Sequence, residues 1–181
     1  MKRVLVDANV VLDVLLDRQP HAKASAAVWT AIETGRSEGL LAAHAVTTIH
    51  YLIRKELGSA RAKRTISAML RVFRVAAVDG PVLLDALELP MADFEDAVTA
   101  AAAGLAGCDF IVTRDPKSLR GAPIRHLTPE AAAALKDRTE LTISGTLDYQ
   151  ACDDTVCFTP QSVPLTWTIG LRALDRERAK P

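Results

Sequence analysis

The sequence predicts an α/β protein with a largely parallel sheet that helices cover on both faces. Short apolar runs of strand type lie around Leu5 and at residues 40–43, 75–78, 110–113 and 124–127. Most stretches between these runs have apolar residues at helical spacing. Such alternation is typical of parallel strands connected by helices that pack back onto the sheet.

The first helical segments end at glycines. The segment 21–34 ends at Gly35, and a helix over about residues 47–57 stops at Gly58. Glycine favours the left-handed conformation that terminates a helix, so both positions are predicted C-termini.

The later helices are predicted from residues that cap a first turn. Ser59 is a candidate N-cap for a basic helix that runs to about Phe73, and Asp93 for the alanine-rich helix after it. The last helix begins at residues 128–130, with threonine as N-cap and proline in the first turn, and fades by about Arg138.

Charge is balanced overall but unevenly distributed. The chain has 181 residues, of which 49% are hydrophobic, and 22 basic residues oppose 22 acidic ones. A core of ordinary size is therefore expected, and no global field indicates a nucleic-acid partner. Residues 79–96 hold six acids and no base, whereas residues 54–74 hold one acid and seven bases. These bases are Arg54, Lys55, Arg61, Lys63, Arg64, Arg71 and Arg74.

Two classes of protein are disfavoured by composition. Aromatic residues make up only 4% of the chain, which argues against a stacking platform for single-stranded nucleic acid. No apolar run approaches the roughly 20 residues that cross a bilayer, and the N-terminus has no signal-peptide pattern. We therefore expect a soluble, cytoplasmic protein without a membrane partner.

The pattern changes after Thr139. Residues 141–147 and 163–169 alternate with period 2 and are rich in threonine and valine, which predicts hairpin-like strands around the loop from Cys152 to Cys157. We place a domain at residues 1–138 and a tail at residues 139–181. So short a tail cannot build an independent core without a partner or a staple.

Acidic residues follow predicted strands or begin predicted helices at three places. Asp7 ends the first apolar strand, residues 93–96 (DFED) open a helix, and Asp115 follows another strand. The carboxyl ends of parallel strands meet at one edge of a sheet, where such proteins bind ligands. Carboxylates suit Mg²⁺, which lowers the pKa of bound water and neutralises charge on a phosphodiester. The predicted chemistry is phosphodiester hydrolysis.

Most of these acids also have a structural explanation. Asp93 can be an N-cap, Asp96 an acid that favours the helix dipole, and Asp115 a turn residue. Asp13 and Asp17 are expected on a solvated helix face or at its end. Only Asp7, which ends the first strand, lacks such an explanation. The combination of the three segments nevertheless favours a metal site.

On residues 6–13 (VDANVVLD), 93–97 (DFEDA) and 111–115 (IVTRD), the chain resembles the PIN domain family. That family comprises metal-dependent ribonucleases and includes the toxins of many bacterial toxin–antitoxin pairs. The resemblance covers about residues 1–137 and implies a three-layer α/β/α sandwich. It also implies Mg²⁺ or Mn²⁺, an RNA substrate, and an antitoxin and a second copy of the chain as candidate partners.

The resemblance also implies roles for individual residues. Asp7 and Asp96 would hold the ion, Asp115 would complete the acidic site, and Asn9 and Thr113 would orient the ligands. The full candidate set is Asp7, Asp96 and Asp115 as metal ligands and catalytic residues, His50 as a catalytic residue, Asn9, Thr113 and Asp93 as support, and Arg114 and Lys117 as phosphate contacts.

One position departs from the family pattern. Such domains usually place a glutamate on the helix after the second strand, where this chain has His50. Imidazole is a poor ligand for Mg²⁺ but acceptable to Mn²⁺, and His50 could instead act as a general base, contact phosphate or have no chemical role. The basic helix at residues 59–74 is a candidate RNA contact, with a merely solvated face as the alternative.

The tail resembles the end of an extracytoplasmic thiol–disulfide interchange domain, an immunoglobulin-like module whose paired cysteines exchange disulfides. The resemblance lies in residues 147–160, so only the closing part of such a domain is present. We interpret the tail as a fused remnant or as an accident of a gene boundary, and a cytoplasmic location would keep Cys152 and Cys157 reduced. Metal binding by the pair is an alternative, although two ligands are too few for a closed zinc site.

The leading hypothesis is a metal-dependent endoribonuclease, the toxin of a toxin–antitoxin pair. One alternative is a PIN-like module that binds RNA or protein but has lost catalysis. A phosphatase of the haloacid dehalogenase type would need a second aspartate where this chain has Asn9. A redox protein acting through Cys152 and Cys157 is the remaining alternative.

Overall fold

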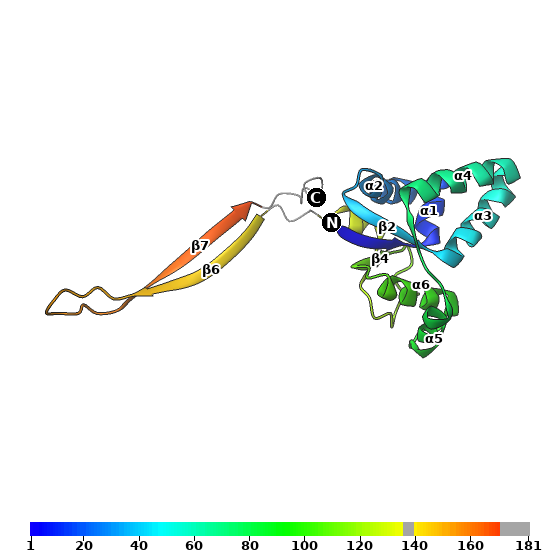
Figure 1. Ribbon diagram of the computed structural model, residues 1–181. Helices are drawn as coiled ribbons and strands as arrows, with labels where there is room; N and C mark the ends of the chain where they lie inside the picture. Colours follow the sequence, from blue (N-terminus) through cyan, green and yellow to red (C-terminus); the bar gives the residue numbers. More distant parts are fainter. Residues whose placement is uncertain (136–139, 171–181) are drawn as a thin grey trace, which may run out of the picture. The chain divides into compact units, whose positions relative to one another are not determined.

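The computed structural model describes residues 1–135 and 140–170, and the chain divides into two compact units (Figure 1). The first unit, Met1–Leu135, contains a parallel sheet with its helices. The second contains a two-stranded hairpin.

The sheet of the first unit has five parallel strands in the order β3-β2-β1-β4-β5. The strands are β1 Lys2–Val6, β2 Ser37–Ala42, β3 Arg74–Ala76, β4 Phe110–Val112 and β5 His126–Leu127. The chain leaves the central β1 toward one edge and returns to its other side at β4, so the strand order reverses at β1. Open parallel sheets bind ligands at the carboxyl ends of the strands beside such a switch point.

Helices cover both faces of this sheet (Figure 1), which confirms the predicted three-layer α/β/α sandwich. Alternate strand residues face opposite layers: Val6 and Val112 pack with α1 to α4, whereas Leu5 and Ile111 pack with α5 and α6. The helices are α1 Ala8–Leu15, α2 Ala22–Glu33, α3 Ala43–Leu57, α4 Ser59–Val72, α5 Gly80–Glu88, α6 Phe94–Leu105 and α7 Pro129–Ala133.

The predicted cap of α6 is confirmed, since Asp93 accepts a 3.1 Å hydrogen bond from the backbone N–H of Asp96. The predicted cap of α4 is wrong: Gly58, with φ of +82°, takes the N-cap position, and Ser59 is already helical. Gly58 therefore ends α3 and begins α4, which leaves no separate linker for a capping side chain.

Two further helix boundaries differ from the prediction, and one helix was not predicted. Helix α3 begins at Ala43, four residues early, because it starts directly where β2 ends. Helix α7 ends at Ala133, and the last part of the predicted segment lies outside the described residues. Helix α5 was not expected from the sequence; the carboxylate of Asp79 caps it by accepting from the Val82 N–H at 3.2 Å.

The second unit is an antiparallel hairpin of β6 Glu140–Tyr149 and β7 Gln161–Gly170, as the period-2 pattern predicted. Apolar pairs such as Ile143 with Trp167 and Leu147 with Val163 share one face, because they lie opposite each other at every second position. All four of these side chains are exposed.

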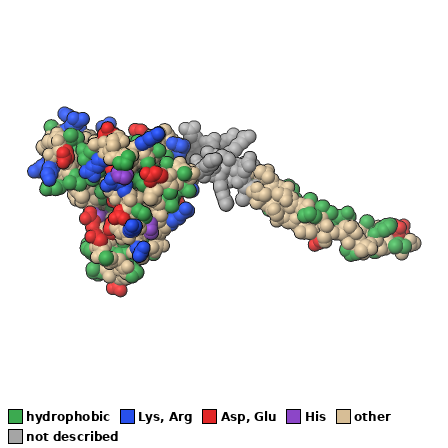
Figure 2. All heavy atoms as spheres, turned by 180° about the vertical axis from the view of Figure 1, so that it is seen from behind, with side chains coloured by type: hydrophobic (Ala, Val, Ile, Leu, Met, Phe, Trp, Pro, Cys, Tyr) green, Lys and Arg blue, Asp and Glu red, His purple; other side chains and the backbone are tan. Residues whose placement is uncertain are grey.

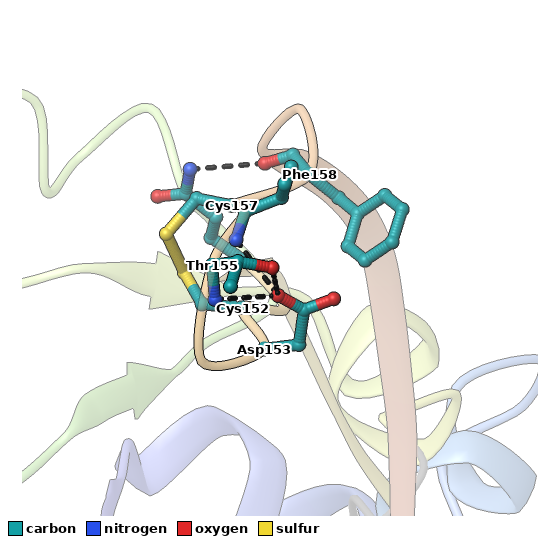
Figure 3. The surroundings of a disulfide bond; sticks show 7 residues. Cys152, Asp153, Thr155, Cys157 and Phe158 are labelled. Carbon is teal, nitrogen blue, oxygen red and sulfur yellow. Dashed lines mark hydrogen bonds between the residues drawn. A yellow bond between two sulfur atoms is a disulfide. The ribbon is translucent and has the colours of Figure 1, made fainter.

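A disulfide between Cys152 and Cys157 closes the loop of the hairpin (Figure 3). Beside it, Asp153 accepts hydrogen bonds from the backbone N–H groups of Thr155 at 2.8 Å and Val156 at 2.7 Å, and so holds the loop in a tight turn. The structure thus joins two cysteines that a cytoplasmic location was expected to keep reduced, because this turn brings them together.

None of the helices in residues 1–135 and 140–170 has both the length and the apolar character needed to cross a membrane.

Candidate active site

The register of the sheet places Asp7 beside Thr113. Val6 pairs with Val112 across β1 and β4, and the Asp7 N–H continues the ladder by donating to the Val112 carbonyl at 2.9 Å. The Thr113 N–H in turn donates to the Leu127 carbonyl of β5 at 3.0 Å. The residues that follow β1 and β4 therefore meet at the carboxyl edge of the sheet, where the strand order reverses.

Two side chains hold the carboxylate of Asp7. The Thr113 hydroxyl donates to Oδ2 of Asp7 at 2.7 Å, and Nδ2 of Asn9 reaches the same oxygen at 2.6 Å. The amide oxygen of Asn9 accepts from the backbone N–H of Arg114 at 3.2 Å. Thr113 is fully buried. The structure thus brings Asp7, Asn9 and Thr113 into direct contact in a fixed arrangement.

Asp93 and Asp115 have the structural roles that the sequence left open. Asp93 caps α6, and the carboxylate of Asp115 accepts from the N–H groups of Lys117 at 3.1 Å and Ser118 at 3.4 Å, which stabilises a turn. Both acids nevertheless act on Asp96 through space, as its pKa indicates.

The pKa of Asp96 lies above its ordinary value. Burial is the largest cause; the Ser118 hydroxyl opposes it, and the negative charges of Asp7, Asp93 and Asp115 raise the pKa of Asp96 further. These acids come from β1, α6 and the loop after β4, so the fold gathers carboxylates that are far apart in sequence.

The pKa of Asp7 is raised as well. Burial is again the largest cause, the hydrogen bond from Thr113 opposes it, and the charge of Glu95 adds to the rise. The negative charge gathered here is of the kind that a bound cation offsets. Glu95 was not among the predicted site residues, although it lies within the acidic stretch that the sequence revealed.

The donor set suits a hard cation in its chemistry. Carboxylate oxygens are the ligands that Mg²⁺ and Mn²⁺ prefer, and Mg²⁺ commonly takes one or two of them while keeping several waters. Within the part of the chain that the structure describes, no three His, Cys, Asp or Glu side chains are grouped so that they could hold a metal ion together. The acids therefore offer suitable ligands without forming a complete coordination cage.

His50 does not join this group by any contact. It is half-buried on α3 and makes no hydrogen bond or ion pair within residues 1–135 and 140–170. The imidazole that lies near one of the acids, Glu95, belongs to His44 in the first turn of α3. Its Nε2 atom lies 3.4 Å from the Thr99 hydroxyl and 4.0 Å from Oε1 of Glu95. Sequence reasoning missed His44, although it follows a predicted strand directly, as Asp7 does.

Asp13 is fully buried, so its expected place on a solvated helix face is wrong. Helix α1 packs against α2, and there the hydroxyl of Ser25 donates to Oδ2 of Asp13 at 3.1 Å. Nη1 of Arg114 lies 3.3 Å from the other carboxylate oxygen. The ion pair compensates a charge that packing has removed from water.

The two predicted phosphate contacts therefore differ in their surroundings. The guanidinium of Arg114 pairs with Asp13 and is 30% exposed, whereas the side chain of Lys117 is exposed. Phosphate binding by either one stays a prediction.

A basic surface covers the part of the first unit that α3 and α4 form. Figure 2 shows Lys and Arg side chains gathered there. Every Lys and Arg side chain of these two helices is exposed. They are Arg54, Lys55, Arg61, Lys63, Arg64 and Arg71.

Solved structures share this fold at low sequence identity. A chain from VapBC2 of Rickettsia felis, bound to a DNA fragment from the promoter, is 10% identical with a TM-score of 0.57 and covers 70% of this chain and 98% of that one. FitAcB from Neisseria gonorrhoeae is 20% identical with a TM-score of 0.57, over 70% and 97% of the two chains. A toxin–antitoxin complex from Klebsiella pneumoniae is 18% identical with a TM-score of 0.53, over the same shares. Identities this low establish the fold alone.

Sequence comparison identifies the family of the first unit. No curated protein matches the chain. The comparisons do not support the resemblance of residues 139–181 to a thiol–disulfide interchange domain. The family model of the PIN domain, in contrast, matches residues 3–117, which is more than half of the sequence. The chain therefore belongs to the PIN domain family.

Proposed function

We propose that this protein is a metal-dependent endoribonuclease and the toxin of a toxin–antitoxin pair. The observation that carries the proposal is the half-buried carboxylate of Asp7, which Asn9 and Thr113 hold at the switch point of the sheet within reach of the charge of Asp96. Membership of the PIN domain family supports a nuclease, and one neighbour of the same fold comes from a toxin–antitoxin complex of Klebsiella pneumoniae.

In this proposal Asp7, Asp96 and Asp115 hold Mg²⁺ or Mn²⁺. Such an ion lowers the pKa of a bound water and neutralises charge on the phosphodiester. Asn9 and Thr113 keep the Asp7 carboxylate in place by hydrogen bonds to Oδ2.

The RNA backbone would be held by basic side chains. The basic surface on α3 and α4 supplies a cluster of exposed Lys and Arg, which is what sequence-independent phosphate binding needs. Arg114 and Lys117 lie nearer the acids and would contact the phosphate that is cleaved. A cognate antitoxin and a second copy of the chain are the proposed protein partners.

A second candidate function is an RNA- or protein-binding module without catalysis. It is favoured by His50, which stands where the family usually has a glutamate, and by the incomplete grouping of metal ligands in the described residues.

Cleavage of RNA by the purified full chain tests the proposal. Wild-type protein is expected to cut RNA with Mg²⁺ or Mn²⁺ and to stop when a chelator is added in excess. Asp7→Asn and Asp96→Asn should both abolish cleavage, because asparagine keeps the volume of aspartate but loses the charge that holds the cation. Asp85→Asn, on an exposed position of α5, is the control and should cleave as wild type does.

Two results would reject the nuclease. Cleavage that survives excess chelator would exclude a metal-dependent reaction. A wild-type protein that binds RNA in the presence of Mn²⁺ but never cuts it would establish the binding module instead, and activity gained by His50→Glu would locate the defect.

A further inference from the structure

We propose that His44 is a positioning residue of this site, which holds the acidic first turns of α6 against the start of α3. The proposal rests on the function proposed above. In this proposal His44 is the histidine of α3 that acts at the site, whereas the family resemblance had pointed to His50.

The sheet topology brings His44 to the site. Strand β2 lies beside β1, so the helix that follows β2 starts at the same carboxyl edge as Asp7. Helix α3 begins at Ala43 without an intervening loop, which puts His44 in its first turn. His50 lies six residues further, or about 240° around an ideal helix, and so faces a different side.

One ring nitrogen of His44 contacts two successive turns of α6. Nε2 lies 3.4 Å from Oγ1 of Thr99 and 4.0 Å from Oε1 of Glu95. Glu95 and Thr99 are four positions apart, so both lie on one face of the helix. The side chain of His44 is 25% exposed and Thr99 is buried, so the contact of His44 with Thr99 lies largely inside the protein.

The other ring nitrogen, Nδ1, is buried and makes no hydrogen bond within the described ranges 1–135 and 140–170. Nε2 is therefore the only atom through which the ring has polar contacts there. Loss of the imidazole would remove the polar link between α3 and α6 that these contacts provide.

This link bears on the acids of the site. Glu95 is 63% exposed, so its carboxylate has few other restraints, yet its charge contributes to the raised pKa of Asp7. Asp96, the proposed metal ligand, lies between Glu95 and Thr99 in sequence. By fixing the residues on both sides of Asp96, His44 sets how the first turns of α6 present their acids to Asp7.

Four variants of the full chain separate positioning from packing. His44→Leu removes both polar contacts but fills much of the volume. His44→Gln keeps an amide that can bond Thr99, and His21→Leu is the matched control, because it makes the same exchange at a half-buried position before α2. Thr99→Val, which removes only the hydroxyl, tests the contact from the side of α6 and is the second probe if His44→Leu does not fold.

The readouts are Mn²⁺ affinity by calorimetry, RNA cleavage, and hydrogen exchange of the α6 amides. His44→Leu is expected to weaken Mn²⁺ binding and lower kcat by roughly tenfold or more, as for other residues that orient metal ligands, with KM for RNA nearly unchanged. Exchange at residues 94–99 should accelerate. His44→Gln should recover most of the loss, Thr99→Val should show part of it, and His21→Leu should match wild type.

The outcomes distinguish this proposal from the function on which it rests. If wild type cleaves RNA and binds Mn²⁺ but His44→Leu does the same, the positioning role is wrong and the nuclease stands. Faster exchange in His44→Leu without a change in Mn²⁺ affinity, or an equal loss in His21→Leu, also overturns it. If wild type neither cleaves RNA nor binds Mn²⁺, the proposed function fails and the role of His44 fails with it.

Discussion

The hydroxyl of Thr113 donates a 2.7 Å hydrogen bond to Oδ2 of Asp7, although the two residues lie 106 positions apart in sequence. The same hydroxyl oxygen accepts from the backbone N–H of Asp115 at 3.1 Å and from Nδ2 of Asn9 at 3.2 Å. Thr113 therefore links three candidate site residues through one buried oxygen.

Thr113→Val should disrupt this centre while keeping the shape of the side chain. It leaves the half-buried carboxylate of Asp7 with one donor fewer, so the pKa of Asp7 should rise further. The free energy of unfolding at neutral pH should fall by about 1–3 kcal/mol. Urea denaturation and RNA cleavage measure the two effects. Thr113→Ser keeps the hydroxyl and is the control; an equal loss in both variants would indicate that packing of the methyl group matters more than the hydrogen bond.

The raised pKa values of Asp7 and Asp96 predict a pH-dependent effect on stability. A carboxyl group whose pKa is higher in the folded state costs stability increasingly as pH rises above its ordinary value of 3.8, and the full cost is reached above the raised pKa. Asp96→Asn should therefore gain stability relative to wild type as pH rises from about 4 toward neutrality. The measurement is the difference in Tm between variant and wild type across this range, and a difference that does not change with pH would contradict the prediction.

Divalent cations should raise the Tm of the wild-type protein at neutral pH. A ligand that binds only the folded state stabilises it by mass action, and a cation offsets the mutual repulsion of the negative charges at this site. Mn²⁺ should leave the Tm of the Asp7→Asn, Asp96→Asn double variant unchanged. Chelation should return the wild type to its metal-free Tm. A similar rise in the double variant would place the bound cation elsewhere on the protein.

Arg114→Met should destabilise the protein strongly. It leaves the carboxylate of Asp13 fully buried without its cation, and breaking a buried ion pair in this way costs about 3–5 kcal/mol. Removing both charges, with Asp13→Asn added to Arg114→Met, should cost less than the sum of the single changes. A double-mutant cycle by chemical denaturation measures this coupling. If Arg114→Met alters only KM for RNA, its guanidinium acts mainly on substrate.

Removal of residues 139–181 should leave the first unit folded and active. Met1–Leu135 forms a compact unit that contains the whole parallel sheet. Tm should change by less than the roughly 3 °C that 1 kcal/mol produces in a domain of this size, and RNA cleavage should persist. Cys152→Ser with Cys157→Ser, in the full chain, should behave in the same way. Aggregation of the truncated protein would show that the tail covers part of the first unit.

Local patterns in the sequence are sufficient to locate the strands, most helices and the first residues of the site. The apolar run before Asp7, the cap at Asp93 and the alternation in residues 141–147 each act over a few neighbouring positions. Their effects survive in the structure as β1, the start of α6 and β6. The sequence does not predict helix α5, because its buried residues, Val82 and Ala86, are too few to produce a clear helical period.

Contacts between distant segments could not be derived from such patterns. The burial of Asp13 depends on α2 and on Arg114, about one hundred positions later, and no local feature distinguishes it from a solvated acid. His44 and Glu95 meet because β2 lies beside β1 and α6 packs over the same sheet edge. A hydrophobic pattern or a helix cap is set by neighbouring residues along the chain. The surroundings of a charged side chain depend instead on which elements pack against it, and the complete fold sets that packing.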